Sequence, residues 1–151
     1  MSKKKNIKKK LCFLSLGSDR LLINDKRKIT GGSELQQIKY AEAISKKNYD
    51  VSLITYKNKI NTQSNSKLKY YFVYDRQELK RYPSILKFLL IWKKLKSINA
   101  DVYLYRAGSP GIITLFSIIY NKKSVKFLAS DSEINNELIE KKKLIDSILF
   151  R

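Results

Sequence analysis

Short apolar segments alternate along this chain with longer segments in which apolar residues recur every three or four positions. The stretch LCFLSL at residues 11–16 is short, mostly apolar and followed by glycine, as is typical of a strand buried on both faces of a parallel sheet. Further strands are expected at residues 51–57, 68–74, 101–108 and 124–130. The apolar spacing predicts helices at residues 33–47, 84–98, 110–122 and 135–151.

The first predicted helix begins with a capping signal. Ser33 and Gln36 have the spacing of a capping box, in which each side chain satisfies a backbone N–H of the first turn. An apolar face is expected along this helix, formed by Leu35, Ile38, Ala41 and Ile44. The preceding residues, 18–32, are polar and basic and are expected to form a long loop.

Strands separated by helical segments imply right-handed crossovers and a parallel sheet with helices on both faces. The fold class is therefore predicted to be α/β and Rossmann-like. Residues 1–10 form a basic N-terminal tail, and residues 11–151 are expected to form one domain. The last predicted helix stops at an apolar Leu149-Phe150 pair without a glycine stop, so we expect this domain to be incomplete at its C-terminus.

The chain is strongly basic, with a formal net charge of +19. Such a charge usually indicates a nucleic-acid partner or an anionic membrane surface. Only six of the 32 basic residues are arginine, however, and arginine is the type better suited to bidentate phosphate and base contacts. The charge supports an anionic neighbour without identifying it.

The cysteine content and the lengths of the apolar runs indicate the cellular compartment in which the protein is expected. The single cysteine, Cys12, can form no internal disulfide, and with no histidine in the chain it cannot anchor a zinc site, so no metal is expected. A reducing cytoplasm fits this composition. The apolar runs are shorter than the roughly 20 residues of a membrane-spanning helix.

Two adjacent glycines, Gly31 and Gly32, stand directly before the first predicted helix. A helix N-terminus at the carboxyl end of a parallel strand presents free N–H groups to anions, and glycine would let a phosphate approach the backbone closely. The spacing matches neither the G-x-G-x-x-G dinucleotide fingerprint nor a P-loop. The two glycines could equally serve only a left-handed turn before a capped helix.

Several segments together resemble a known family. They are GGSELQQIKYAEAISKKNYDVSLIT, ADVYLYRAGSPGI and KFLASDSEIN. Their order and spacing closely resemble the N-terminal domain of family-4-like, GT-B-fold glycosyltransferases. The likeness extends from Leu11 to Arg151.

The resemblance implies roles for particular residues. Gly31 and Gly32 match the family's glycine loop, which lies near the donor's diphosphate and the acceptor. Arg106 and Ser109 match cleft positions, and a guanidinium there could pair with phosphate, although Arg106 could also simply extend from the strand end into solvent. Glu34 and Gln37 are expected only to cap or support the loop.

Ser130 and Asp131 stand where many relatives carry a His-Asp pair that lines the acceptor site. The chain has no histidine, so no mechanism that needs an imidazole on this domain is possible. Asp131 is the candidate catalytic residue, because it could orient an acceptor hydroxyl or act as a base. It could equally cap the helix that follows.

The resemblance implies an enzyme that transfers a sugar from a nucleotide-sugar to a polysaccharide, glycolipid or other glycoconjugate acceptor, the acceptor being a sugar or a lipid-linked sugar, without a cofactor. The donor site would lie on a C-terminal domain missing here, so this chain alone is expected to be inactive. The enzyme is expected in the cytoplasm, with the inner membrane face as a candidate location.

Two other interpretations come from charge and pattern. Residues 79–96 combine six basic residues with Leu86, Phe88, Leu89, Trp92 and Leu95, which suits a helix lying on anionic lipid. A crossover helix with its inner face in the core and its lysines in water is the favoured interpretation. A nucleic-acid-binding module, with aromatics at residues 70–74 stacking on bases, is less favoured because these residues lie consecutively in a strand.

Overall fold

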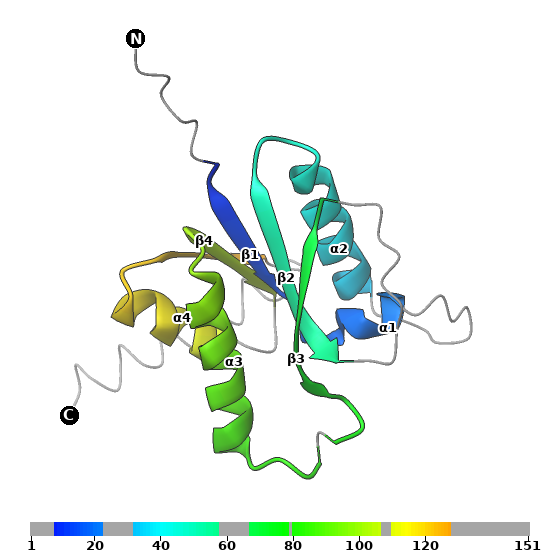
Figure 1. Cartoon of the computed structure of the whole chain (residues 1–151), viewed down its shortest axis with the longest axis vertical. Coiled ribbons are helices and arrows are strands. Elements are labelled where there is room, and N and C mark those ends of the chain that lie inside the picture. The colour runs from blue at the N-terminus through cyan, green and yellow to red at the C-terminus, as the bar shows by residue number, and fades with distance from the viewer. Residues whose placement is uncertain (1–7, 23–31, 58–66, 79, 107–109, 128–151) are drawn as a thin grey trace, which may run out of the picture.

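The computed structural model describes residues 8–22, 32–57, 67–78, 80–106 and 110–127, which form a sheet flanked by helices (Figure 1). The strands are β1 (Lys10–Leu14), β2 (Asp50–Lys57), β3 (Lys69–Asp75), β4 (Val102–Arg106) and β5 (Lys123–Phe127). The helical elements are the 3₁₀ turn η1 (Leu16–Ser18) and the helices α1 (Asp19–Leu22), α2 (Gly32–Ser45), α3 (Ser84–Ile98) and α4 (Pro110–Ile119).

The five strands pair in the order β3-β2-β1-β4-β5, and every pair is parallel. This arrangement confirms the α/β, Rossmann-like fold class. The chain runs outward from β1 to β3 and then returns to place β4 on the other side of β1. The strand order therefore reverses between β1 and β4, and ligands of such sheets bind outside the carboxyl ends of the strands at this switch point.

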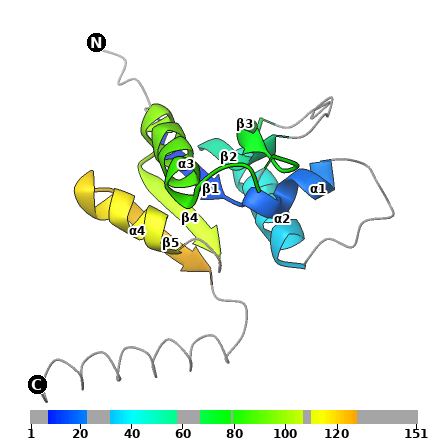
Figure 2. The same cartoon turned by 90° about the horizontal axis from the view of Figure 1, so that it is seen from below.

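Helices cover both faces of the sheet (Figure 2). Along β1 the side chains alternate, so that Cys12 and Leu14 face the cluster beneath α3 and α4, while Phe13 faces the cluster beneath α2. All three are buried. The first four residues of the apolar run at 11–16 therefore lie in a strand buried on both faces, as predicted, while Leu16 begins η1.

The buried face of α2 differs from the prediction. Ile38 and Ala41 are buried as expected, but Leu35 is 41% exposed, and the polar Gln37 and Ser45 are buried instead. The helix is rotated so that residues 37, 38, 41 and 45 face the sheet. These positions follow the three- and four-residue steps of a helix, and hydropathy alone could not reveal that two of them are polar.

The polar segment at residues 18–32 is not entirely loop. Its first residues, Ser18 and Asp19, have no exposed surface and lie in η1 and at the start of α1. Residues 23–31 lie outside the described part of the chain. The prediction of a loop was therefore wrong for its first residues, which are helical and pack at the carboxyl end of β1.

The remaining predicted elements agree with the structure to within a few residues where they are described. Helix α3 begins directly after Pro83 and ends at Ile98. The next residue, Asn99, caps it with a left-handed φ of 46°. The helix predicted at residues 135–151 lies outside the described residues. Across the described residues, no helix combines the length and hydrophobicity that a membrane crossing requires.

Candidate functional site

The candidate site lies at the carboxyl edge of the sheet, where the neighbouring strands β1 and β4 end. Helix α2 begins at this edge after β1, and Arg106 is the last residue of β4. β1 and β4 are neighbours, with Leu14 opposite Tyr105. The topology therefore places Gly32 and Arg106, two candidates that are 74 positions apart in sequence, at the same edge of the sheet.

Gly32 is the first residue of α2 and is exposed. Among the described residues, a methyl group built on its Cα would meet no atom within 4 Å, and its φ is not in the left-handed range. Neither these neighbours nor the backbone conformation therefore require glycine at this position. On the side of the described residues, the absence of a side chain leaves the first turn of α2 open to an approaching molecule.

Arg106 reaches from β4 to the first turns of α2. Its Nη1 donates a hydrogen bond to Oε1 of Gln36 at 2.6 Å. The Nε2 of Gln36 in turn donates to the hydroxyl of Tyr40 at 3.2 Å. Gln36 lies one helical turn after Gly32, so the guanidinium is held beside the helix face that begins at Gly32.

The other predicted site residues cannot be placed. Gly31, Ser109, Ser130 and Asp131 lie outside the described residues. Their expected roles at the glycine loop, the cleft and the acceptor site stay predictions.

The expected capping box does not form. Helix α2 begins at Gly32, so Ser33 is already inside the helix. The Ser33 hydroxyl donates to the carboxylate of Glu34, and the Gln36 side chain is engaged by Arg106 and Tyr40. The capping prediction was wrong because Gln36 contacts a distant strand instead of the start of its own helix.

Glu34 has a specific packing partner at the end of β1. A Cβ added at Gly17 would lie 2.9 Å from Oε1 and 3.2 Å from Cγ of Glu34. Gly17 thus leaves the space in which the Glu34 side chain lies. This contact holds the first turn of α2 against η1.

Replacing Gly17 with alanine is expected to lower the free energy of unfolding by about 1 kcal/mol, because the new methyl group overlaps the Glu34 side chain. Glu34 is flexible enough to move aside, which keeps the loss small. Urea denaturation of Gly17→Ala, Glu34→Ala and the double variant would measure the coupling. Strictly additive effects would show that the two positions do not compete for the same space.

A buried ion pair links the end of β1 to the end of β3. The Asp19 side chain has no exposed surface, and its Oδ1 accepts a hydrogen bond from Nη1 of Arg76 at 2.9 Å. Burial raises the pKa of the Asp19 carboxyl, and the nearby Arg76 opposes this rise. The guanidinium also lies 5.5 Å from the centre of the Tyr56 ring.

Further buried polar groups lie in the segment after β1 and in β2. The hydroxyls of Ser15 and Ser18 share a hydrogen bond, and Thr55 Oγ1 donates to the carbonyl of Leu16 at 3.0 Å. Three buried polar atoms have no partner among the described residues, namely Oδ2 of Asp19, Oε1 of Gln37 and, on α4, Oγ of Ser117. Since buried polar atoms are normally paired, these atoms could form hydrogen bonds with water or a ligand.

Sequence reasoning missed Asp19, Arg76 and Gly17 as parts of this edge. One signal was available, because small and polar residues stand directly after the apolar strand in the stretch LGSD. Parallel strands place such residues at a common edge. No local signal pointed to Arg76, which is 57 positions away from its partner.

The described residues offer no reactive thiol and no metal cluster. Burial raises the pKa of the Cys12 thiol, so its nucleophilic thiolate form is suppressed at neutral pH. No group of three or more cysteine, aspartate or glutamate side chains in the described ranges could hold a metal ion.

The described site has the features that an anion requires. The first turn of α2 carries backbone N–H groups and a partial positive charge, and Arg106 carries a full positive charge. These features fit a phosphate or diphosphate at the switch point.

No family model matches the chain, and no curated protein matches it either.

Proposed function

We propose that this chain is the acceptor-side domain of a glycosyltransferase that uses a nucleotide-sugar donor. The donor's diphosphate would lie at the open first turn of α2, beside Arg106. The acceptor would be a polysaccharide, a glycolipid or another glycoconjugate. The candidate catalytic residue is Asp131, which would orient or deprotonate the acceptor hydroxyl.

The observation that carries the proposal is the combination at the switch point. No described neighbour requires glycine at position 32, and Arg106 is hydrogen-bonded to Gln36, one helical turn after Gly32. A cation and free backbone N–H groups at one strand edge suit a diphosphate better than a neutral ligand. The resemblance of the segments around Gly32 and Arg106 to a glycosyltransferase domain adds the reaction class.

The roles of the chain's own residues follow from this placement. Backbone N–H groups of α2 would bind phosphate oxygens, and Arg106 would offset charge that develops on the leaving diphosphate. Helix α2 is held by packing of Glu34 over Gly17 and by Ile38 and Ala41 in the core. Such preorganised donors lower the barrier because they need no rearrangement during the reaction.

The first experiment is to read the gene beyond the codon for Arg151. We expect a second Rossmann-like domain that carries the nucleotide-sugar site. The longer protein should transfer sugar to a suitable acceptor, whereas the 151-residue chain should not. A gene product without a second domain would contradict the proposal.

In the longer protein, Gly32→Val is expected to lower kcat/KM for the donor on the order of tenfold to a hundredfold, because a branched side chain would displace the diphosphate. The free energy of unfolding should change by no more than about 0.5 kcal/mol, since the site is exposed and open. Steady-state kinetics and urea denaturation would measure the two effects.

Ser84→Val provides the matched control. Ser84 is also an exposed first residue of a helix, but it belongs to α3 and not to the switch point. This variant should retain its kcat/KM. Unchanged kinetics for Gly32→Val would show that the first turn of α2 is not part of the donor site.

A basic, non-enzymatic module that binds nucleic acid or an anionic membrane is the alternative function. The aromatics of β3 give little support to base stacking, because Tyr71 and Tyr74 pack with the core on one face and Tyr70 with the core on the other. Tyr74 contacts both Tyr56 and Tyr82, with ring centres 5.3 and 5.9 Å away. An anionic membrane surface stays a candidate partner of the enzyme as well.

A further inference from the structure

The outer surfaces of α3 and α4 expose an unusual number of large apolar side chains. On α3 the exposed fractions are 71% for Ile85 and 53% for Leu89. On α4 they are 45% for Leu115, 73% for Ile118 and 58% for Ile119. We call these five residues the α3–α4 apolar face.

These residues point away from the protein core. Leu89 is two positions from the buried Ile91, and Ile118 is two positions from the buried Phe116, which places each on the far side of its helix. The two helices lie side by side on the same face of the sheet, and Trp92 packs edge-on against Phe116 with ring centres 5.1 Å apart (Figure 2). The two helices thus present their exposed apolar residues from one layer of the domain.

Only part of the lipid-facing set considered from the sequence is available. Leu95 is fully buried, and Phe88 and Trp92 pack against the core cluster beneath α3. The crossover-helix interpretation of α3 is thus correct for its inner face. It does not account for Ile85 and Leu89, which remain in solvent.

The charged residues on α3 and α4 have one sign. Helices α3 and α4 contain no acidic residue, and α3 carries Lys87, Lys93, Lys94 and Lys96. Asp101 is the single acidic residue in the sequence from position 80 to 127. An acid-free, basic and apolar surface is complementary to an anionic lipid bilayer.

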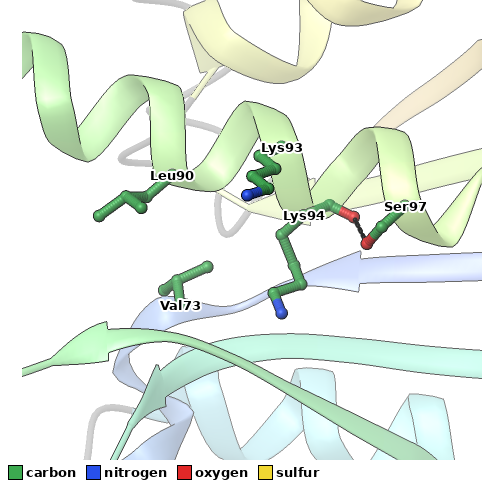
Figure 3. A pocket seen from close by; sticks show the side chains of 5 residues that line it. All are labelled: Val73, Leu90, Lys93, Lys94 and Ser97. Atoms are coloured by element: carbon green, nitrogen blue, oxygen red, sulfur yellow. Dashed lines mark hydrogen bonds between the residues drawn. The ribbon is translucent and has the colours of Figure 1, made fainter.

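A pocket of about 290 Å³ adjoins α3 and is lined by Val73, Leu90, Lys93, Lys94 and Ser97. Lys94 extends from the helix toward the strands, and Leu90 and Val73 lie opposite each other (Figure 3). Among the described residues, neither ammonium group has an anionic partner. Lys93 lies one helical turn after Leu89, which joins the pocket to the α3–α4 apolar face.

We propose that the α3–α4 apolar face docks on an anionic phospholipid bilayer and that Lys93 and Lys94 bind a lipid phosphate at the pocket. The apolar side chains enter the boundary between headgroups and acyl chains, while the lysines stay at headgroup depth. The walls formed by Val73 and Leu90 suit the hydrocarbon next to a phosphate ester. This inference does not depend on sugar transfer.

A bilayer fits this surface better than other occupants. A second copy of the chain would bring lysines against lysines, with no acidic residue on either helix to pair with them. A nucleic acid would satisfy the lysines but would leave Ile85 and Ile118 without an apolar environment. A bilayer satisfies both sets of side chains at once.

Flotation of the 151-residue chain with two kinds of vesicle tests the proposal. One kind contains phosphatidylcholine alone, and the other also contains phosphatidylglycerol. We expect binding to the anionic vesicles and little binding to the neutral ones. Leu89→Glu/Ile118→Glu should reduce the partition coefficient at least about tenfold, because two charges would enter an apolar layer. Lys93→Gln/Lys94→Gln should reduce it by about fivefold for each lysine.

Matched controls keep the net charge equal. Leu35→Glu/Tyr49→Glu changes two exposed apolar residues outside α3 and α4, and Lys46→Gln/Lys47→Gln removes two exposed lysines elsewhere. Both controls should bind anionic vesicles nearly as the parent chain does. Thermal unfolding of every variant verifies that it is folded.

Several outcomes would overturn the proposal. Equal partitioning onto both kinds of vesicle would show that the negative charge of the lipid does not contribute to binding. Equal losses in the test variants and the controls would show that net charge alone drives binding. A dimer in gel filtration that Leu89→Glu/Ile118→Glu dissociates, without vesicle binding, would assign the face to a second copy. Tight binding of an oligonucleotide that Lys93→Gln/Lys94→Gln abolishes, again without vesicle binding, would assign it to nucleic acid.

Discussion

Arg76→Met is expected to lower the free energy of unfolding by about 3 kcal/mol, because it leaves the buried carboxylate of Asp19 without its cation. The side chain of Arg76 is 34% exposed, so the loss should be at the lower end of what breaking a buried ion pair costs. The Oδ2 of Asp19 already has no partner among the described residues. The variant also loses the contact between the guanidinium and the Tyr56 ring.

The loss should depend on pH in a definite direction. Burial raises the pKa of Asp19 above its ordinary value of 3.8, and Arg76 limits this rise, so the pKa should be higher still in Arg76→Met. Between the unfolded and folded pKa values, the folded state holds a proton that the unfolded state has released. Stability therefore falls as pH rises through this window. The gap between variant and parent should be smallest in acid and largest near neutral pH.

Urea denaturation across this pH range measures both effects. Asp19→Asn/Arg76→Met should recover part of the lost stability and should show no excess pH dependence, since it has no buried carboxyl at position 19. Arg81→Met, which changes an exposed arginine, should be nearly neutral. A pH-independent loss in Arg76→Met would show that packing, and not the charge of Asp19, accounts for the effect.

Phe116→Ala is expected to lower the free energy of unfolding by about 4 kcal/mol. Phe116 is 2% exposed, and its ring contacts those of Trp92, Tyr103 and Tyr120. Removing it leaves a cavity at the point where α3, α4 and β4 meet. The neighbouring aromatic rings are too rigid to fill that space completely.

Leu115→Ala is the matched control for this change. Leu115 is the neighbouring residue on α4 but is 45% exposed, so its truncation should cost about 0.5 kcal/mol or less. Chemical denaturation monitored by the single tryptophan, Trp92, would follow unfolding at the affected contact. Similar losses for the two variants would mean that the aromatic cluster does not organise the α3–α4 layer.

Local pattern was sufficient for the elements themselves. The residues of β1 are apolar in succession, and the structure buries Cys12 and Phe13 on opposite faces of the sheet. The helix predicted at residues 84–98 coincides with α3, and Pro83 directly before it suits a position where the first helical N–H groups have no partner. Alternation of strands and helices then predicted a parallel sheet, which the strand pairing confirms.

The details of the candidate site were less accessible. Gly32 could be selected from the sequence, but whether its first turn was open or covered depended on neighbours from other elements. Arg106 could be placed at a strand end, but its hydrogen bond to Gln36 depends on β4 lying beside β1. The capping box failed for the same reason, since a distant guanidinium competes for the Gln36 side chain.

The sequence by itself determined the strands and the three long helices of the described residues, the parallel α/β class and the lysine-rich character of α3, because these follow from the periodicity and chemistry of neighbouring residues. Only the tertiary structure decided which faces of α2 and α3 are buried, which side chains meet at the carboxyl edge, and which apolar residues of α4 stay in solvent. Those outcomes depend on contacts between residues far apart in the chain. A helix can present any of several faces to a sheet, and the complete packing of the domain selects one of them.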